Sequence, residues 1–203
     1  MKKAFTMLEL VFVIVVIGIL AAVVIPRIGS NKLQEAAIQV VSHIRYTQHL
    51  ALVDDKFNEA PVANEWYKKR WQIQFESGAV EVGYMIYSDI NHGGNADAGE
   101  FAIDPLSRKT ISEGSDIANL KKKYGITQVQ FDNTCRGGAT GELSFDFLGR
   151  PYFHLTATSN NYENLLTANC DITLTSSEGE AKIRVHPETG YTCVLDSAGT
   201  DCI

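Results

Sequence analysis

The apolar run FTMLELVFVIVVIGILAAVVI occupies residues 5–25 and has the strongest structural consequence of any segment in the chain. Thr6 and Glu9 are its polar side chains, and Leu10 to Ile25 contains none. A helix that rises ~1.5 Å per residue would be about 32 Å long over this run, against a hydrocarbon core of about 30 Å. The run therefore predicts a helix that crosses a membrane.

Two lysines, Lys2 and Lys3, set the expected orientation of this helix. Positive charge tends to stay on the cytoplasmic side, so the rest of the chain would be carried across. A cleaved secretory signal peptide is the alternative, but its apolar region would be shorter and a small-x-small cleavage motif would follow. Here the run ends in Ile25-Pro26-Arg27. We therefore expect a single-pass inner-membrane protein with its C-terminal domain in the periplasm.

The residues after Pro26 predict an amphipathic helix that continues the first one to about residue 54 or 55. Its apolar positions mostly recur at spacings of three and four, at Leu33, Ala37, Val40, Val41, Ile44 and Leu52. We expect a kink near Pro26 or Gly29 and an apolar stripe that packs on a sheet.

The rest of the chain predicts strands, because apolar and polar residues alternate with a period of two. The alternating segments are 71–75, 80–87, 127–131, 143–147, 152–157, 172–175, 181–185 and 191–195. The expected fold class is α+β, with one long N-terminal helix packed on an antiparallel β-sheet domain. One half of that helix would be transmembrane and the other half amphipathic.

Four cysteines, Cys135, Cys170, Cys193 and Cys202, lie in the last third of the chain. They form no C-x-x-C pair and have no histidine at zinc-ligand spacing, which favours two disulfides over a metal site. Three pairings are possible. We favour Cys193–Cys202, which closes a short C-terminal loop, together with Cys135–Cys170. Such bonds would place the domain in an oxidising compartment.

The first ten residues, Met1-Lys2-Lys3-Ala4-Phe5-Thr6-Met7-Leu8-Glu9-Leu10, resemble the type IV prepilin signature. The resemblance implies that a prepilin peptidase cleaves between Ala4 and Phe5 and methylates the new amino group, although Ala4 stands where the family usually has glycine. It also implies that Phe5 and Glu9 act in assembly, because the carboxylate can pair with the new ammonium of a neighbouring subunit. On charge alone, Glu9 could equally lie at the membrane interface without a partner.

Two later segments, Leu143–Pro151 and Val185–Tyr191, resemble the GspH/FimT minor pseudopilin domain. In that family a Phe-x-x-x-Gly-Arg turn precedes a closing hairpin that ends in a Thr-Gly turn. The resemblance implies a non-catalytic assembly subunit of a type II secretion pseudopilus or a type IV pilus. The implied partners are other pilin or pseudopilin subunits, prepilin peptidase and the inner membrane. The expected divisions are a leader (1–4), a transmembrane and assembly helix (5–27), its amphipathic continuation (28–55) and a periplasmic GspH/FimT-like domain (56–203).

Two other functions are open. A competence-type minor pilin would bind DNA during uptake, but the stretch 190–193 lacks the arginines that some family members use. The basic runs 68–70 and 121–123 remain as candidates, against a net charge of -6. A membrane-anchored hydrolase is the other alternative. We predict no enzymatic activity, because no nucleophile elbow, zinc-protease motif, phosphate loop or dinucleotide fingerprint is present.

Residues 89–100 have the spacing of a calcium loop, with Gly94 at the sixth place. The candidate ligands are Asp89, Asn91, Asn95, Asp97 and Glu100. Gly93 stands where a fifth-place ligand is usual, and the segment follows a predicted strand. A hydrogen-bonded turn without metal, which GspH/FimT proteins often carry at such a position, is the alternative. Calcium is the one cofactor that the sequence suggests.

Overall fold

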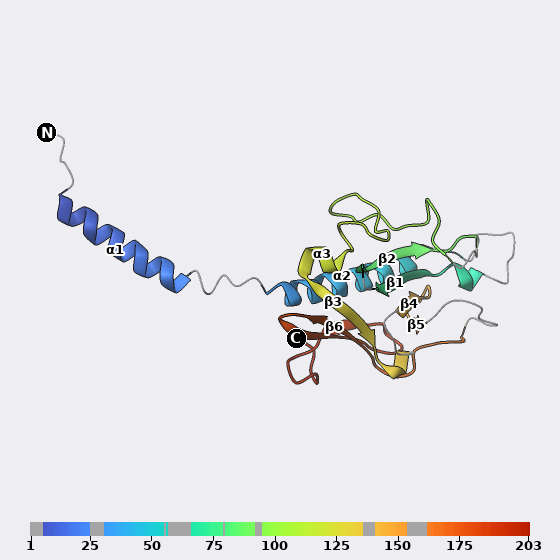
Figure 1. Cartoon of the computed structure of the whole chain (residues 1–203). Coiled ribbons are helices and arrows are strands. Elements are labelled where there is room, and N and C mark those ends of the chain that lie inside the picture. Colours follow the sequence, from blue (N-terminus) through green and yellow to red (C-terminus); the bar gives the residue numbers. More distant parts are fainter. Residues whose placement is uncertain are drawn as a thin grey trace. The chain divides into compact units, whose positions relative to one another are not determined.

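The computed structural model describes residues 6–24, 31–54, 56, 66–78, 80–91, 95–135, 141–153 and 162–203 (Figure 1). The chain divides into two compact units, Met1–Asn31 and Lys32–Ile203. The first unit contains the helix α1, Met7–Val24, and the second contains the other described elements. The two units are described separately below.

The prediction of one long helix with a membrane-crossing half is wrong. The structure has a helix α1 of 18 residues in one unit and a helix α2, Lys32–Val53, in the other. At ~1.5 Å per residue, α1 is about 27 Å long, shorter than a hydrocarbon core of about 30 Å. The carboxylate of Glu9 lies in its first turn, so the uncharged part is shorter still.

The predicted localisation is corrected by the same observation. Among the helices that the structure describes, none combines the length and the apolarity needed to cross a membrane. The expectation of a single-pass inner-membrane protein is therefore wrong.

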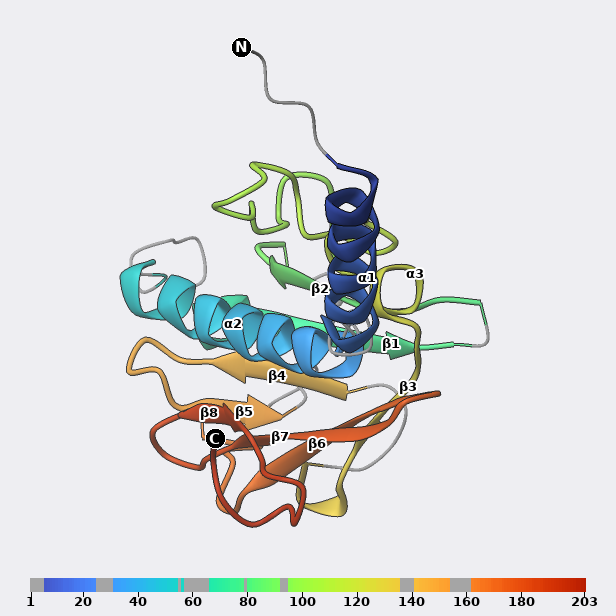
Figure 2. The ribbon, with the colours of Figure 1, turned by 90° about the vertical axis from the view of Figure 1, so that its left-hand side faces the viewer.

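The helix α2 is amphipathic, as its spacing predicts, and it packs against strands of both sheets (Figure 2). Leu52 was expected in its apolar stripe but is 51% exposed. The stripe continues from Ile44 through Thr47 and Ala51 instead, because these positions follow at spacings of three and four. The buried residues of α2 are Leu33, Ala36, Ala37, Val40, Val41, His43, Ile44, Thr47 and Ala51.

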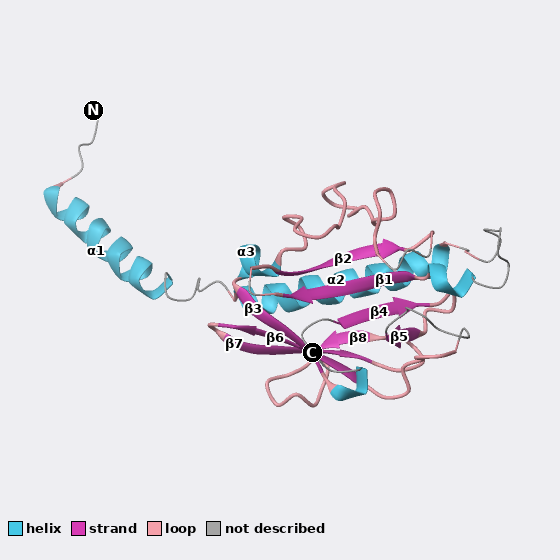
Figure 3. Cartoon of the chain, turned by 45° about the vertical axis from the view of Figure 1, so that its right-hand side comes forward, coloured by secondary structure: helices cyan, strands magenta, loops and turns pink. Residues whose placement is uncertain are grey.

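Within the described part of the chain, eight strands form two four-stranded sheets, and each pairing between them is antiparallel (Figure 3). The first sheet has the order β2-β1-β4-β5 and the second has the order β3-β6-β7-β8. The bounds of the strands are Trp71–Ser77 (β1), Val82–Ser88 (β2), Ile126–Phe131 (β3), Gly141–Phe145 (β4), Pro151–Phe153 (β5), Cys170–Ser176 (β6), Gly179–Val185 (β7) and Thr192–Val194 (β8).

Alternation along the strands places one apolar face of each sheet in the core. In the first sheet, Ile73 and Phe75 of β1 and Phe145 of β4 are fully buried. In the second sheet, Ile172 of β6 and Ile183 of β7 are paired in register and fully buried. The core of this unit therefore consists of the apolar stripe of α2 and the inner faces of both sheets.

Three short helices lie among the described residues, one between α2 and β1 and two between strands. They are η2 (Trp66–Lys69), α3 (Leu120–Tyr124) and η3 (Asn133–Cys135). The side chain of Asn119 accepts a hydrogen bond from the Lys122 amide at the start of α3, and Gly125 ends the helix with a φ of 72°. Glycine suits that position because the left-handed conformation places no Cβ against the backbone.

Candidate functional site

The start of α1 is closed by a capping box made of Thr6 and Glu9. The Glu9 amide donates to Thr6 Oγ1 at 3.3 Å, and the Thr6 amide donates back to Glu9 Oε2 at 2.9 Å. The Thr6 hydroxyl donates to the same carboxylate oxygen at 2.9 Å. Because Thr-x-x-Glu satisfies two amides that a helix start leaves without partners, it fixes where α1 begins. This role of Glu9 was missed, although the spacing of the two residues indicates it.

The surface of α1 is apolar on all sides. Its exposed large apolar side chains have exposed fractions between 38% and 85%, and they are Met7, Leu8, Leu10, Val11, Phe12, Val13, Ile14, Val15, Val16, Ile17, Ile19 and Leu20. A helix that is hydrophobic all round is normally buried, and an exposed apolar patch of this size marks an interaction site. The helix therefore offers an extended apolar surface that other protein could cover.

The residues expected for processing fall at the end of the chain that the structure does not describe. Ala4 and Phe5 lie outside the described residues, so cleavage between them stays a prediction. Glu9, the other expected assembly residue, lies in the first turn of α1, with one carboxylate oxygen in the capping box. The structure therefore holds this carboxylate at the N-terminal end of the apolar surface.

The two segments that resemble the GspH/FimT family meet at one side chain of α2. Gln48 Nε2 donates to the carbonyl oxygens of Gly149 and Thr189, at 2.8 Å each. Gly149 lies in the turn between β4 and β5, and Thr189 lies in the turn between β7 and β8. The nearby Arg45 donates to the Thr192 carbonyl at 2.6 Å through one of its nitrogens. Two turns that are about forty residues apart are thus fixed to one face of α2.

The first of these turns is organised around Asp146, which is 2% exposed. One carboxylate oxygen accepts from the amides of Leu148 and Arg150, at 3.0 Å and 2.9 Å. The other accepts from the Arg150 guanidinium at 2.7 Å and from the Tyr152 hydroxyl at 3.2 Å. The Asp and Arg of this motif therefore form an ion pair, with a buried carboxylate and a partly exposed guanidinium, that shapes the turn.

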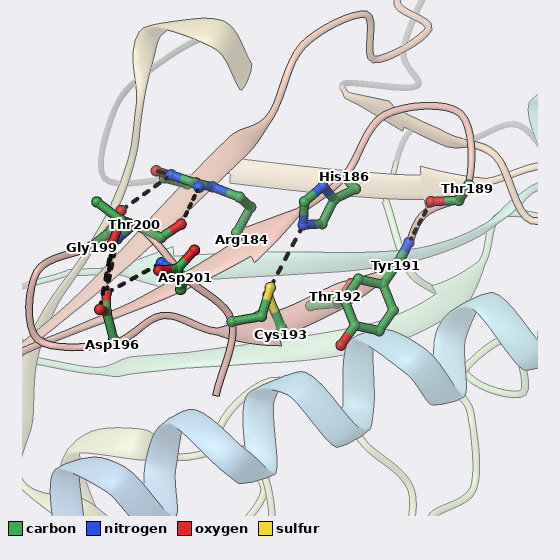
Figure 4. The surroundings of a disulfide bond; sticks show 12 residues. Arg184, His186, Thr189, Tyr191, Thr192, Cys193, Asp196, Gly199, Thr200 and Asp201 are labelled. Carbon is green, nitrogen blue, oxygen red and sulfur yellow. Dashed lines mark hydrogen bonds and ion pairs between the residues drawn. A yellow bond between two sulfur atoms is a disulfide. The ribbon is translucent and has the colours of Figure 1, made fainter.

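Two disulfides are present, with the pairings that the sequence favours. Cys135–Cys170 joins η3 to β6, and both residues are buried. Cys193–Cys202 joins β8 to the C-terminal residues, and Cys193 is buried while Cys202 is exposed (Figure 4). Disulfides of this kind are typical of proteins that fold in an oxidising compartment.

The suggested calcium loop is closed by its own hydrogen bonds. Glu100 accepts from the Ile90 amide through one carboxylate oxygen and from the Asp97 amide through the other, both at 2.8 Å. Asn91 donates to Asp97 at 2.6 Å. Among the described residues, the carboxylates of Asp89, Asp97 and Glu100 do not converge as a metal-ligating group. These contacts of the described residues favour the hydrogen-bonded turn, whereas Gly94 lies outside the described residues. Calcium binding stays an untested prediction.

The basic runs suggested for DNA contact are engaged within the domain. Arg70 is 5% exposed and stacks its guanidinium 3.7 Å above the Tyr152 ring. Lys122 pairs with Asp116 at 2.7 Å, and Lys123 donates to Gln39 at 2.6 Å. Phosphate binding needs several cations that converge on one surface, and these contacts do not favour it.

The hydrolase alternative would require a nucleophile, a base and an orienting residue close together, and Tyr84, His43 and Asp104 do lie next to one another. The Tyr84 hydroxyl accepts from Gln39 at 2.8 Å and lies 2.6 Å from His43 Nδ1, while His43 Nε2 lies 3.8 Å from Asp104. The three residues are 2%, 8% and 6% exposed, respectively. With its hydroxyl already bonded and buried, Tyr84 forms part of a core network between α2 and β2.

This network predicts that the domain loses stability in mild acid. Burial lowers the pKa of His43, and this effect is larger than the rise in pKa that the nearby Asp104 carboxylate causes. From about pH 6.5 down to the lowered pKa, the unfolded chain binds more protons than the folded one, so the free energy of unfolding falls as the pH falls. We expect this decline in urea denaturation of the wild-type chain and not in His43→Gln.

The matched control for that experiment is the exposed His49 on the same helix. His49→Gln should keep the wild-type pH dependence. Burial raises the pKa of Asp104, but the hydrogen bonds from Ser107 and Leu106 and the charge of His43 together lower it, so its effect belongs to a window below about pH 4. An unchanged decline in His43→Gln would contradict the assignment to His43.

Comparison with models of protein families finds no match to this sequence, and neither do comparisons with curated proteins and with solved structures.

Proposed function

We propose that this chain is a non-catalytic, pilin-like subunit that joins a pseudopilus or pilus through its N-terminal helix. The observation that carries the proposal is the apolar surface on all sides of α1, with the carboxylate of Glu9 held at its first turn. The prepilin-like order of the first ten residues and the GspH/FimT-like turns support the same reading.

The apolar surface supports assembly because it needs to be covered. Burying one exposed Val, Leu, Ile, Phe or Met side chain is worth about 1.5–3 kcal/mol, and α1 presents many of them. Helices of neighbouring subunits would cover all sides at once, as the interior of a helical filament does. A single partner in a groove would leave part of the surface in water.

Glu9 supports the same proposal through its charge. A carboxylate among packed apolar helices is costly unless it has a positive partner. Cleavage before Phe5 would create an ammonium group on each subunit, and a neighbour's ammonium could pair with Glu9. The capping box uses Oε2 of Glu9 and holds the carboxylate in place for that contact.

Three variants separate the charge of Glu9 from its capping role. Glu9→Gln keeps the side chain that a capping box requires but removes the charge, whereas Thr6→Ala weakens the cap and keeps the charge. Glu9→Ala removes both. For both Glu9 variants, we expect the amount of this chain in filaments sheared from the cells to fall at least about tenfold. The reason is that an unpaired buried ammonium costs several kcal/mol.

Thr6→Ala is the control and should still be incorporated, because a lost cap costs about 1 kcal/mol. Total protein and disulfide content should match the wild type in every variant. Normal incorporation of Glu9→Gln would contradict the charge pairing, and normal incorporation of both Glu9 variants would contradict the proposed assembly site.

A further inference from the structure

We propose that reduction of the Cys193–Cys202 disulfide creates a three-ligand site for Zn²⁺ or a similar thiophilic divalent cation, made of His186, Cys193 and Cys202. The ligand atoms of these residues lie within 4.8 Å of one another. His186 follows β7 and Cys193 lies in β8 (Figure 4), whereas Cys202 lies in the segment after β8. While the disulfide is intact, the sulfurs are not thiolates and the site is closed to metal.

The distance between histidine and cysteine already suits a tetrahedral zinc site. His186 Nε2 lies 3.7 Å from Cys202 Sγ. With Zn–N near 2.0–2.1 Å and Zn–S near 2.3 Å, a tetrahedral centre places these two ligand atoms about 3.6 Å apart. Two thiolates on the same ion would be about 3.8 Å apart, so the sulfurs must separate after reduction. The exposed side chain of Cys202 can supply that movement by rotation. Its backbone stays in place, because Cys202 bridges Leu195 and the Ile203 amide donates to the Val194 carbonyl at 3.0 Å.

The other two ligands are fixed by the fold. The His186 amide donates to the Tyr191 carbonyl at 2.8 Å, and the Gly190 amide donates to the His186 carbonyl at 3.1 Å. The imidazole also lies against the Tyr191 ring, with 5.6 Å between the ring centroids. Cys193 is 2% exposed and is paired in register with Arg184 of β7. A cation would therefore meet two ligands that the fold holds in place, His186 and Cys193, and a third ligand, Cys202, whose side chain moves to bind it.

The chemistry requires a reductant of the dithiol class. The disulfide takes two electrons and two protons from the dithiol, which itself becomes a disulfide, and two cysteine thiols result. Zn²⁺ then replaces the two thiol protons and accepts a lone pair from neutral His186. Water can complete the coordination on the exposed side of Cys202.

The second disulfide provides a matched control within the same chain. Asp132, Cys135 and Cys170 also bring their ligand atoms within 4.8 Å of one another. Both cysteines are buried, and Asp132 Oδ1 already accepts hydrogen bonds from the Thr134 hydroxyl at 2.6 Å and the Cys135 amide at 3.2 Å. This group has no imidazole and no exposed sulfur, so we expect it to bind Zn²⁺ far more weakly.

The test uses the full chain, reduced with a dithiol, desalted without oxygen to remove that reductant, and titrated with Co²⁺. We expect one equivalent to bind with thiolate-to-cobalt absorption, which added Zn²⁺ removes. His186→Ala should weaken Co²⁺ binding at least about tenfold, since even second-shell changes at metal sites cost 10–100-fold. Cys193→Ser/Cys202→Ser should lose the absorption, and Cys135→Ser/Cys170→Ser should keep it.

A measurement on the reduced wild-type chain covers the case in which a cysteine variant fails to fold. Zn²⁺ should slow alkylation of Cys193 and Cys202, located by mass spectrometry, without protecting Cys135 and Cys170. The proposal is overturned if the reduced wild type shows no thiolate-to-cobalt absorption. It is also overturned if His186→Ala binds Co²⁺ as tightly as the wild type, or if Zn²⁺ protects only the other pair.

Discussion

Replacing Asp146 with alanine is expected to lower the free energy of unfolding by about 3–5 kcal/mol, because hydrogen bonds to a charged group contribute about 1.5–3 kcal/mol and a buried group left without its partner costs about 1–3 kcal/mol. The Asp146 side chain is 1% exposed and the Arg150 side chain is 27% exposed. Removal of the Asp146 carboxylate would take away the acceptor of the Arg150 guanidinium and of the buried Tyr152 hydroxyl. It would also release the two turn amides that the carboxylate fixes.

The control for Asp146→Ala is Asp116→Ala, which breaks a solvent-exposed ion pair with the same distance between its nitrogen and oxygen atoms. Asp116 and Lys122 are 2.7 Å apart, and each side chain is 71% exposed. Exposed pairs contribute about 0–1 kcal/mol, so urea denaturation should show little change. Equal losses in the two variants would contradict the view that the Asp146 pair organises the turn.

Replacing Gly190 with alanine is expected to cost about 2–5 kcal/mol, the sum of left-handed strain and overpacking. Gly190 has a φ of 64°, and an added Cβ would lie 2.6 Å from the Gly149 carbonyl oxygen and 2.5 Å from Gln48 Nε2. The Gln48 side chain can move, but the Gly149 carbonyl is backbone and accepts the Gln48 hydrogen bond. The two motif turns would therefore have to separate.

The control for Gly190→Ala is Gly125→Ala at the end of α3. Gly125 has a similar φ of 72°, but a Cβ there would meet no atom within 4 Å. Gly125→Ala should therefore lose only the stability that the left-handed backbone strain costs, about 1–2 kcal/mol. The difference between the two glycine variants in urea denaturation thus measures the close approach of the turns, and equal losses would contradict that approach.

The strands could be located from the sequence because alternation is a local property. Each of the eight alternating segments overlaps a strand, although residues 154–157 of one segment lie outside the described residues. The apolar positions Ile73 and Phe75 face the core as the period of two requires. The apolar stripe of α2 was predicted as far as Ile44, because a spacing of three and four along a helix is a local property as well. Leu52 was misplaced because both Ala51 and Leu52 fit a spacing of three or four, and only packing against the sheets decides between them.

The long continuous helix was a wrong inference from hydropathy, which measures apolar length but not where a helix ends. The convergence of Gly149 and Thr189 on Gln48 could not be read from the sequence either, because it depends on how two turns pack on α2. The same holds for the position of His186 beside Cys202, since no sequence spacing brings residues 186, 193 and 202 together. The capping box of Thr6 and Glu9, by contrast, is a local pattern that could have been found.

The intact mass of the mature protein, purified from its native host, decides whether this chain is a processed pilin-like subunit. We expect the loss of Met1–Ala4 and the gain of one methyl group on Phe5. We also expect a gain of four hydrogen atoms on reduction, two for each disulfide. An intact Met1–Ala4 leader, or cleavage after the apolar run, would contradict the proposal that α1 is an assembly helix of the pilin type.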